Sequence, residues 1–168
     1  MTNTSLSVFS DDDFFFMAEA IKEAEKARLI DEVPVGAVLV YEGNIIGRGY
    51  NQVISKSDPT CHAEIMAIRD AGLHLNNYRL VNSTLYVTLE PCLMCAGAIF
   101  NARIQQVIYG AKEPKTGASG SVIDAFSLSQ LNFHATVTGG LMSDTCAQML
   151  SDFFRLRRQN KTDTESTK

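Results

Sequence analysis

The stretch that most constrains the fold of this chain is residues 90–95, which read Glu-Pro-Cys-Leu-Met-Cys. A strand-like run precedes it at 84–89, and a helix-like run follows it. Pro91 suits the first position of a helix, because its missing N–H costs nothing there. Cys92 and Cys95 are three residues apart, so a helical turn places both sulfurs on one side, where the helix dipole favours thiolates. The fold must therefore lead a strand into a helix whose first turn carries two thiolates.

Two thiolates in this position can bind a metal or form a redox disulfide, and the Cys-x-x-Cys spacing alone does not separate these roles. A second motif upstream, Cys61-His-Ala-Glu64, supplies a histidine ligand and a carboxylate at the start of another helix. Catalytic zinc takes three protein ligands, whereas structural zinc takes four. Cys61 adjoins His62, where one metal can hardly reach both, so we place it outside the site. We therefore expect a three-ligand site.

These residue types fit a hydrolytic reaction. His62, Cys92 and Cys95 would hold Zn²⁺, and Glu64 would take a proton from water and pass it on to a ring nitrogen and to departing ammonia. Such chemistry suits an amidine-like carbon, for example C4 of cytosine or C6 of adenine. The combination of His-x-Glu with Pro-Cys-x-x-Cys is the signature of zinc-dependent nucleobase deaminases.

Length and composition predict one domain over residues 1–168, with an ordered core at about 12–158 and polar tails. The apolar fraction of 45% and charged fraction of 20% are ordinary for a globular protein. The sequence has no run long enough for a membrane span and no signal peptide. Four cysteines are too few for a disulfide scaffold, so we expect a cytoplasmic protein.

The net charge of −4 hides an uneven distribution. Acidic residues concentrate in 1–32, whereas the stretch 103–115 is locally basic. A second basic stretch contains Arg155, Arg157, Arg158 and Lys161. An acidic protein with two basic patches can bind RNA locally.

Hydrophobic periodicity predicts an α/β fold with a mixed five-stranded sheet between helices on both faces, which is a three-layer arrangement. We expect helices at 12–28, 61–73, 91–103 and from 143, strands at 33–41, 45–50, 84–89, 105–110 and 133–138, and a short helical piece at 121–128. Two stripes are expected in the core: Phe14, Met17, Ile21 and Ala24, and then Cys146, Met149, Leu150, Phe153 and Phe154. From residue 160 the chain is expected to fray. Both zinc motifs then sit at helix starts and can converge.

From about Phe14 to Arg158 the chain resembles the bacterial tRNA-specific adenosine deaminases, whose fold is cytidine-deaminase-like. The matching stretches are 33–40, Asn51, 58–60, 62–67, 88–98, 115–117 and 151–155. The last two lie outside the general deaminase signature and separate the tRNA enzymes from deaminases of free nucleosides.

The resemblance implies hydrolytic deamination of adenosine to inosine at the wobble position of tRNA anticodons, by a homodimer with one Zn²⁺ per subunit. The resemblance assigns zinc binding to His62, Cys92 and Cys95, proton transfer to Glu64, and base binding to Asn51 and Ala63. It also assigns contacts with the anticodon stem-loop to Lys112, Glu113, Lys115, Phe154 and Arg155.

Two alternatives remain open at this point: a deaminase of a free base or nucleoside, of the guanine or cytosine type, and an RNA-binding module with structural zinc. The chain also departs from the family at two positions. Glu113 stands where members usually carry Asp, which affects the backbone contact of its loop. Cys61 stands where they carry a small residue, and we hypothesise that this thiol makes the enzyme sensitive to oxidation.

Overall fold

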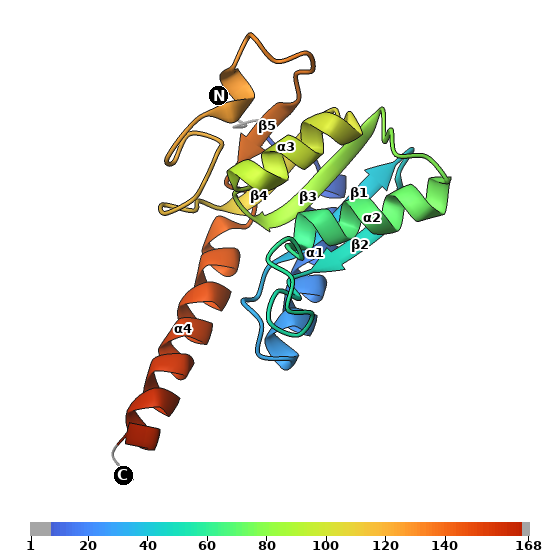
Figure 1. Ribbon diagram of the computed structural model, residues 1–168. Coiled ribbons are helices and arrows are strands. Elements are labelled where there is room, and N and C mark those ends of the chain that lie inside the picture. The colour runs from blue at the N-terminus through green and yellow to red at the C-terminus, as the bar shows by residue number, and fades with distance from the viewer. Residues whose placement is uncertain (1–7, 166–168) are drawn as a thin grey trace, which may run out of the picture.

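The computed structural model describes residues 8–165, with side chains described as far as Asn160. Within that range, five strands form one mixed sheet in the order β2-β1-β3-β4-β5 (Figure 1). The strands are β1 (Gly36–Tyr41), β2 (Asn44–Tyr50), β3 (Ser83–Leu89), β4 (Gln106–Ala111) and β5 (Thr136–Gly139). β1 is antiparallel to β2 and β3, whereas β3, β4 and β5 run parallel. The predicted mixed five-stranded sheet is confirmed.

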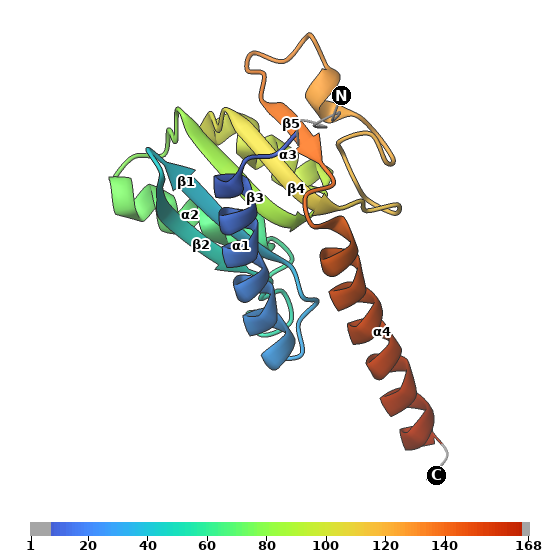
Figure 2. The same cartoon turned by 180° about the vertical axis from the view of Figure 1, so that it is seen from behind.

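Helices cover both faces of the sheet, as Figures 1 and 2 show from opposite sides. α2 (Ala63–Leu75) and α3 (Leu93–Ala102) pack on one face, together with a short 3₁₀ helix, η1 (Ala125–Ser127). α1 (Asp11–Leu29) and the start of α4 (Ser143–Glu165) pack on the other. Each face has its own apolar core, so the predicted α/β/α layering holds.

The two helices that carry the zinc motifs begin later than the sequence predicts. His62 is the N-cap of α2 and Cys92 the N-cap of α3, both with extended backbone. Pro91 therefore precedes α3 instead of taking its first position, and that prediction was wrong. Because an N-cap side chain lies beside the free N–H groups of the first turn, both ligand candidates sit at the positive end of a helix dipole.

Both predicted core stripes were partly wrong. In α1, Met17 and Ala24 are buried, but Phe14 is 44% exposed. In α4, Cys146 and Phe153 are buried, whereas Phe154 is 43% exposed. The reason is visible in Figure 2, where α4 leaves the sheet after its first turns and extends away from the body, so its far half has little to pack against. The helix also continues to Glu165, beyond the predicted fraying at 160.

α2 packs unusually closely on β2, because small residues face each other. Ala63, Ala67 and Ala71 of α2 are fully buried. A Cβ on Gly47 would lie 2.3 Å from the Ala67 carbonyl oxygen, and one on Gly49 would lie 2.2 Å from that of Ala63. Only glycine permits this approach of helix backbone to strand. The position of α2, and with it His62, is set by this contact.

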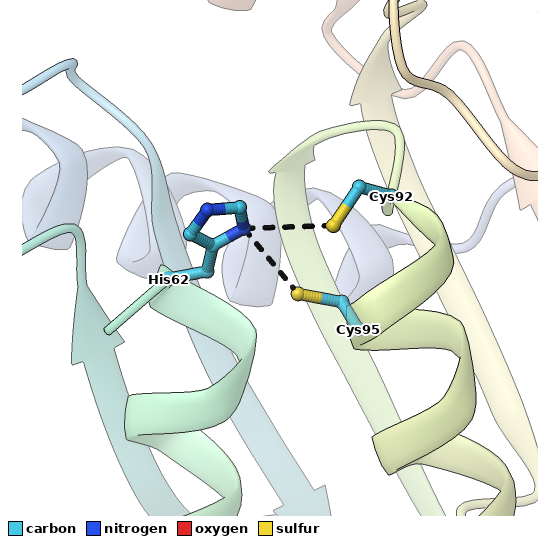
Figure 3. Close-up of side chains that lie close together, drawn as sticks. All are labelled: His62, Cys92 and Cys95. Atoms are coloured by element: carbon cyan, nitrogen blue, oxygen red, sulfur yellow. Dashed lines mark hydrogen bonds between the residues drawn. The ribbon is translucent and has the colours of Figure 1, made fainter. Parts of the chain in front are cut away.

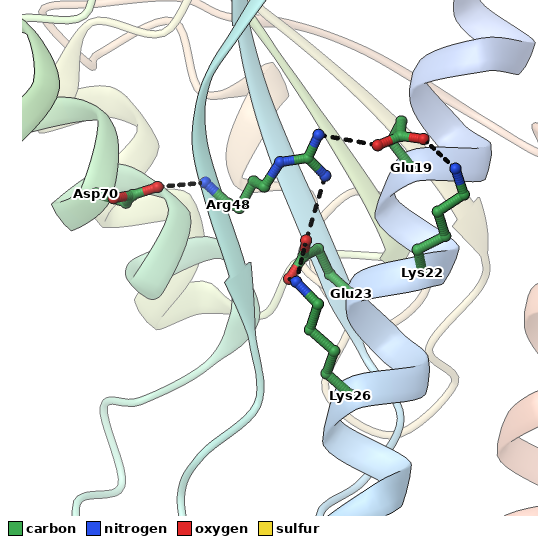
Figure 4. A network of polar contacts seen from close by, with 6 residues as sticks. All are labelled: Glu19, Lys22, Glu23, Lys26, Arg48 and Asp70. Atoms are coloured by element: carbon green, nitrogen blue, oxygen red, sulfur yellow. Dashed lines mark hydrogen bonds and ion pairs between the residues drawn. The ribbon is translucent and has the colours of Figure 1, made fainter.

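Between these glycines, the side chain of Arg48 points to the opposite face and ties β2 to α1 (Figure 4). Its guanidinium contacts Glu19 at 2.8 Å and the buried Glu23 at 3.2 Å. Its backbone N–H donates to the Asp70 carboxylate of α2 at 2.8 Å. β2 is an edge strand, and Asp70 satisfies one of its outward N–H groups, which protects the edge from pairing with another chain.

None of the helices in the described part of the chain combines the length and the apolar character needed to cross a bilayer.

Gly47→Ala should lower the free energy of unfolding by about 2 kcal/mol, because the added methyl group meets helix backbone that cannot move aside. Gly72→Ala in α2 is the matched control, since its Cβ would meet only the Asn77 oxygen at 3.5 Å. That change should be neutral or stabilising by up to about 1 kcal/mol. Urea unfolding of both variants measures the effect, and equal stabilities would contradict the close packing.

Candidate active site

His62, Cys92 and Cys95 converge between the N-termini of α2 and α3 (Figure 3). His62 Nδ1 lies 3.6 Å from Cys92 Sγ and 3.6 Å from Cys95 Sγ. A tetrahedral zinc ion with ordinary Zn–N and Zn–S bonds holds its nitrogen and sulfur ligands about 3.6 Å apart. Both the donor types and their spacing therefore fit Zn²⁺, and these three side chains could hold one ion.

The electrostatics of the cluster favour deprotonated sulfur. A hydrogen bond from the Cys95 thiol, assisted by His62, lowers the pKa of Cys92 to about 4 although the residue is half-buried. The same bond, together with burial, raises the pKa of Cys95. The two sulfurs thus share one proton when no cation is present. Metal binding to thiols releases protons, so a divalent cation would replace this shared proton.

Glu64 lies in the first turn of α2 and is only 4% exposed. Burial raises the pKa of its carboxyl group to about 7, and hydrogen bonds from its own backbone N–H and from Cys95 offset part of that effect. A carboxyl group with a pKa near neutrality can both accept and return a proton at physiological pH.

His62, Glu64 and Cys92 line a cavity of about 310 Å³. That volume lies at the lower end of the range for small-molecule sites. A larger cavity of about 660 Å³ between α1 and α4 is lined by neither histidine nor cysteine, so we place the chemistry in the smaller one. The smaller cavity is lined by Glu32, Val33, Val35, Asn51, Val53, Ile54, His62, Glu64, Leu89, Glu90, Cys92, Glu113 and Thr116.

Asn51 and Ala63 are linked directly at one wall of this cavity. The side-chain Oδ1 of Asn51 accepts the backbone N–H of Ala63 at 2.9 Å, which satisfies one of the free donors at the start of α2. The loop between them is braced by Glu32, whose Oε1 accepts the N–H of Ser55 at 2.7 Å. The Asn51 side chain is therefore held with its amide nitrogen available for another acceptor.

The RNA-contact residues expected from the sequence divide into two groups. Glu113 lines the cavity, and Lys112 and Lys115 are exposed on the same loop. Phe154 and Arg155 are exposed on α4, where Arg155 pairs with Asp152 at 2.9 Å. No residue of α4 up to Asn160 lines the cavity. The fold of one chain therefore brings the first group to the cavity but not the second.

Cys61 lies outside the cluster, as expected. Its Sγ is 3.3 Å from Asp58 Oδ2 and 3.9 Å from Arg69 Nη1. Burial and the Asp58 carboxylate raise the pKa of this thiol. Because the thiolate is the form that reacts with oxidants, this environment disfavours the oxidation sensitivity hypothesised from the sequence.

Two buried acids at the cavity were missed by the sequence analysis. Glu32 and Glu90 are each 2% exposed. Each stands next to an apolar run, and an acid in such a place is a signal of a satisfied buried carboxylate. The partners that satisfy it lie far along the chain and could not be read from spacing.

Comparisons with known proteins agree with this geometry. The family model of the cytidine and deoxycytidylate deaminase zinc-binding region matches residues 10–111. The tRNA-specific adenosine deaminase of Haemophilus influenzae is 50% identical over 92% of this chain and 90% of its own.

Solved structures of deaminases are also similar to this chain. One from a study of A-to-I editing by tRNA:A34 deaminases at the wobble position of transfer RNA has a TM-score of 0.78 and 46% identity, over 81% of this chain and 99% of that one. A guanine deaminase from Bacillus subtilis has a TM-score of 0.57 and 32% identity, over 72% and 87% respectively.

We expect purified protein to carry close to one zinc ion per chain. Cys92→Ala should lose it and lower the melting temperature by about 5 to 10 °C, because a bound ion stabilises only the folded state. Cys146→Ala is the control: Cys146 is buried between α4 and the sheet, so the change costs some packing but leaves zinc in place. Elemental analysis and thermal melts distinguish the two. Full zinc content in Cys92→Ala would contradict the assignment.

Proposed function

The chain belongs to the cytidine and deoxycytidylate deaminase family and, within it, to the tRNA-specific adenosine deaminases, and we propose that it converts adenosine to inosine at the wobble position of tRNA anticodons. The convergence of His62, Cys92 and Cys95 beside the buried Glu64 is the observation that carries this proposal. The reaction consumes water and releases ammonia.

His62, Cys92 and Cys95 would hold one Zn²⁺ per subunit. Bound there, zinc acts as a Lewis acid that makes a water molecule more acidic. Two thiolates neutralise the charge of the ion and weaken that effect compared with three histidines. The site therefore depends on a nearby base.

Glu64 is the base in this proposal. Its carboxylate accepts a proton from the attacking water and delivers it to N1 of the adenine ring. It then carries the second proton to the exocyclic nitrogen at C6, which leaves as ammonia. The raised pKa of about 7 supports both directions of transfer at neutral pH.

Asn51 and Ala63 would position the flipped-out base. Because Asn51 Oδ1 is occupied by the Ala63 N–H, the two Nδ2 donors remain for an acceptor on the purine. A base fixed at one edge in a small cavity presents its C6 in a single orientation, which reduces the entropy cost of reaching the transition state.

Two basic regions would hold the anticodon stem-loop. Lys112, Glu113 and Lys115 lie on the loop at the mouth of the cavity. On α4, the exposed ring of Phe154 can stack on an unpaired base, and Arg155 can contact phosphate. Single-stranded loops are the RNA elements whose bases can enter such a pocket.

A homodimer is part of the proposal. Exposed apolar side chains gather at the end of α2 and just beyond it, namely Leu73, Leu75 and Tyr78. Such clusters on a soluble domain are typical of protein interfaces. The α4 residues that do not reach the cavity of their own chain also fit an assembly in which a second copy contributes to RNA binding.

We further propose that the whole chain acts as one deaminase domain in the cytoplasm. Two cores on opposite faces of a single sheet support one cooperative unit. The site needs reduced thiols, which a cytoplasmic location maintains.

The test is incubation of the purified protein with an anticodon stem-loop that bears a wobble adenosine, followed by detection of inosine. Free adenosine and free guanine are parallel substrates. Inosine from the stem-loop alone supports the proposal. Deamination of a free base or nucleoside by a zinc-loaded protein that leaves the stem-loop unchanged would overturn it.

Glu64→Gln should keep zinc and fold but lose at least about 100-fold in turnover, because the amide cannot transfer protons. Glu23→Gln is the matched control, since Glu23 is an equally buried acid on the opposite face of the sheet, where its carboxylate accepts hydrogen bonds from Lys26 and Arg48. The amide oxygen of glutamine can still do that, so turnover should fall by no more than a few-fold. Single-turnover deamination measures both, and an active Glu64→Gln enzyme would refute the mechanism.

A further inference from the structure

The loop at 112–121 carries three of the residues proposed to contact RNA, yet it contains no helix and no named strand. Its first five residues, 112–116, are exposed or half-exposed, so apolar packing does not fix their position. The second half of the loop is held by the buried side chain of Ala118 and by a bridge between Gly117 and Cys92. Something other than a core must determine the shape of residues 112–116.

The Glu90 carboxylate supplies that constraint. Its Oε2 accepts the backbone N–H of Glu113 at 3.0 Å. Its Oε1 accepts those of Ser119 at 2.9 Å and Ser121 at 3.2 Å. The Ser121 hydroxyl also donates to Oε2. Four donors from both ends of the loop therefore meet one buried carboxylate, which matches the number of lone pairs that it offers.

The loop is also shaped around this carboxylate. A Cβ on Gly117 would lie 2.5 Å from Glu90 Cδ, so the backbone of the loop approaches the carboxyl group as closely as glycine allows. The N–H of Ala118 donates to the Pro91 carbonyl at 2.8 Å, and the Glu90 N–H donates to the Ala111 carbonyl at 2.8 Å. Backbone bonds on both sides of Glu90 thus fix where the loop begins and where it returns.

Glu90 is unsuited to contact RNA itself. It is 2% exposed, and a carboxylate would repel phosphate. Its acceptor positions are already used within the protein. It also lies two residues before Cys92, so it joins the loop to the chain segment that carries the metal cluster.

We propose that Glu90 is a positioning residue for RNA recognition: its carboxylate holds loop 112–121 in the shape that presents Lys112, Glu113 and Lys115 to the anticodon stem-loop. The inference rests on the proposed function. Glu90 acts through the loop and takes no part in proton transfer. Its loss should therefore weaken binding of RNA far more than it slows the chemical step.

Glu90→Gln is the informative change because it keeps the size of the side chain. The amide nitrogen of glutamine donates where the carboxylate oxygen accepts, so it faces N–H groups that it cannot satisfy. About half of the anchoring bonds are lost, and these are charge-assisted bonds of the stronger kind. We expect the dissociation constant for the stem-loop to rise about ten-fold or more.

Binding is best measured in the inactive Glu64→Gln background with a fluorescent anticodon stem-loop. Glu64→Gln/Glu90→Gln should bind about ten-fold more weakly than Glu64→Gln, whereas Glu64→Gln/Glu23→Gln should bind as tightly. Equal affinity of the Glu90 variant would overturn the inference. If Glu64→Gln itself does not bind the stem-loop, the proposed function fails instead.

A second measurement tests the anchor without RNA. Trypsin should cleave after Lys112 or Lys115 faster in Glu90→Gln than in the wild type, with Ser121→Ala in between because it removes a single donor. In the active enzyme, Ser121→Ala should raise KM for the stem-loop a few-fold at unchanged kcat and zinc content. If Glu90→Gln folds poorly, the separate effects of Ser121→Ala on KM and on kcat test the inference in its place. A fall in kcat at unchanged KM would overturn the inference.

Discussion

The close contact between α2 and β2 is the constraint on which the rest of this structure depends. His62 is the N-cap of α2, so any movement of that helix away from the sheet moves the histidine away from the two cysteines of α3. Gly47 and Gly49 allow the helix backbone to lie directly on the strand. The nitrogen-to-sulfur distances of 3.6 Å are the result, and they match what a tetrahedral zinc needs. Gly47 and Gly49 thus set the geometry of the candidate zinc site, although neither residue is a metal ligand.

The same packing gives the site its electrostatics. α2 carries Glu64 into the interior in the turn that follows His62, and burial there raises its pKa to about 7. In the cluster beside it, hydrogen bonding lowers the pKa of Cys92 to about 4. Two groups a few residues from helix starts are therefore shifted in opposite directions, one toward proton transfer and the other toward cation binding. The difference arises because the carboxyl group is desolvated, whereas the thiol receives hydrogen bonds.

Much of this site could be predicted from the sequence, because its chemistry is carried by short motifs at helix starts. His62, Glu64, Cys92 and Cys95 were each placed at the start of a helix. The strands that precede the two helices, β2 and β3, are both antiparallel to β1 and so run parallel to each other, which brings the two helix starts to the same edge of the sheet. The burial of residues on helix α4 was harder to predict. Its apolar spacing predicted a buried stripe, but periodicity says only which residues share a face and not whether anything covers it, and Phe154 proved exposed. Glu90 was missed for a different reason, since its partners lie 23 to 31 residues away in the chain.

The long sequence separation between Glu90 and its partners also explains how the structure assigns the chemistry and the RNA contacts to different parts of the fold. The groups proposed for chemistry stand on helix N-termini held by packing, which tolerates little displacement. Three of the groups proposed for RNA contact, Lys112, Glu113 and Lys115, stand on the exposed half of an irregular loop, which apolar burial cannot hold without removing the lysines from solvent. A buried carboxylate resolves this conflict, because it fixes backbone N–H groups and leaves the side chains of the loop free to face RNA. The loop is then rigid where it joins the metal cluster and exposed where a nucleic acid would meet it. Such an arrangement lowers the ordering entropy that binding would otherwise cost, which is the physical basis of preorganised recognition.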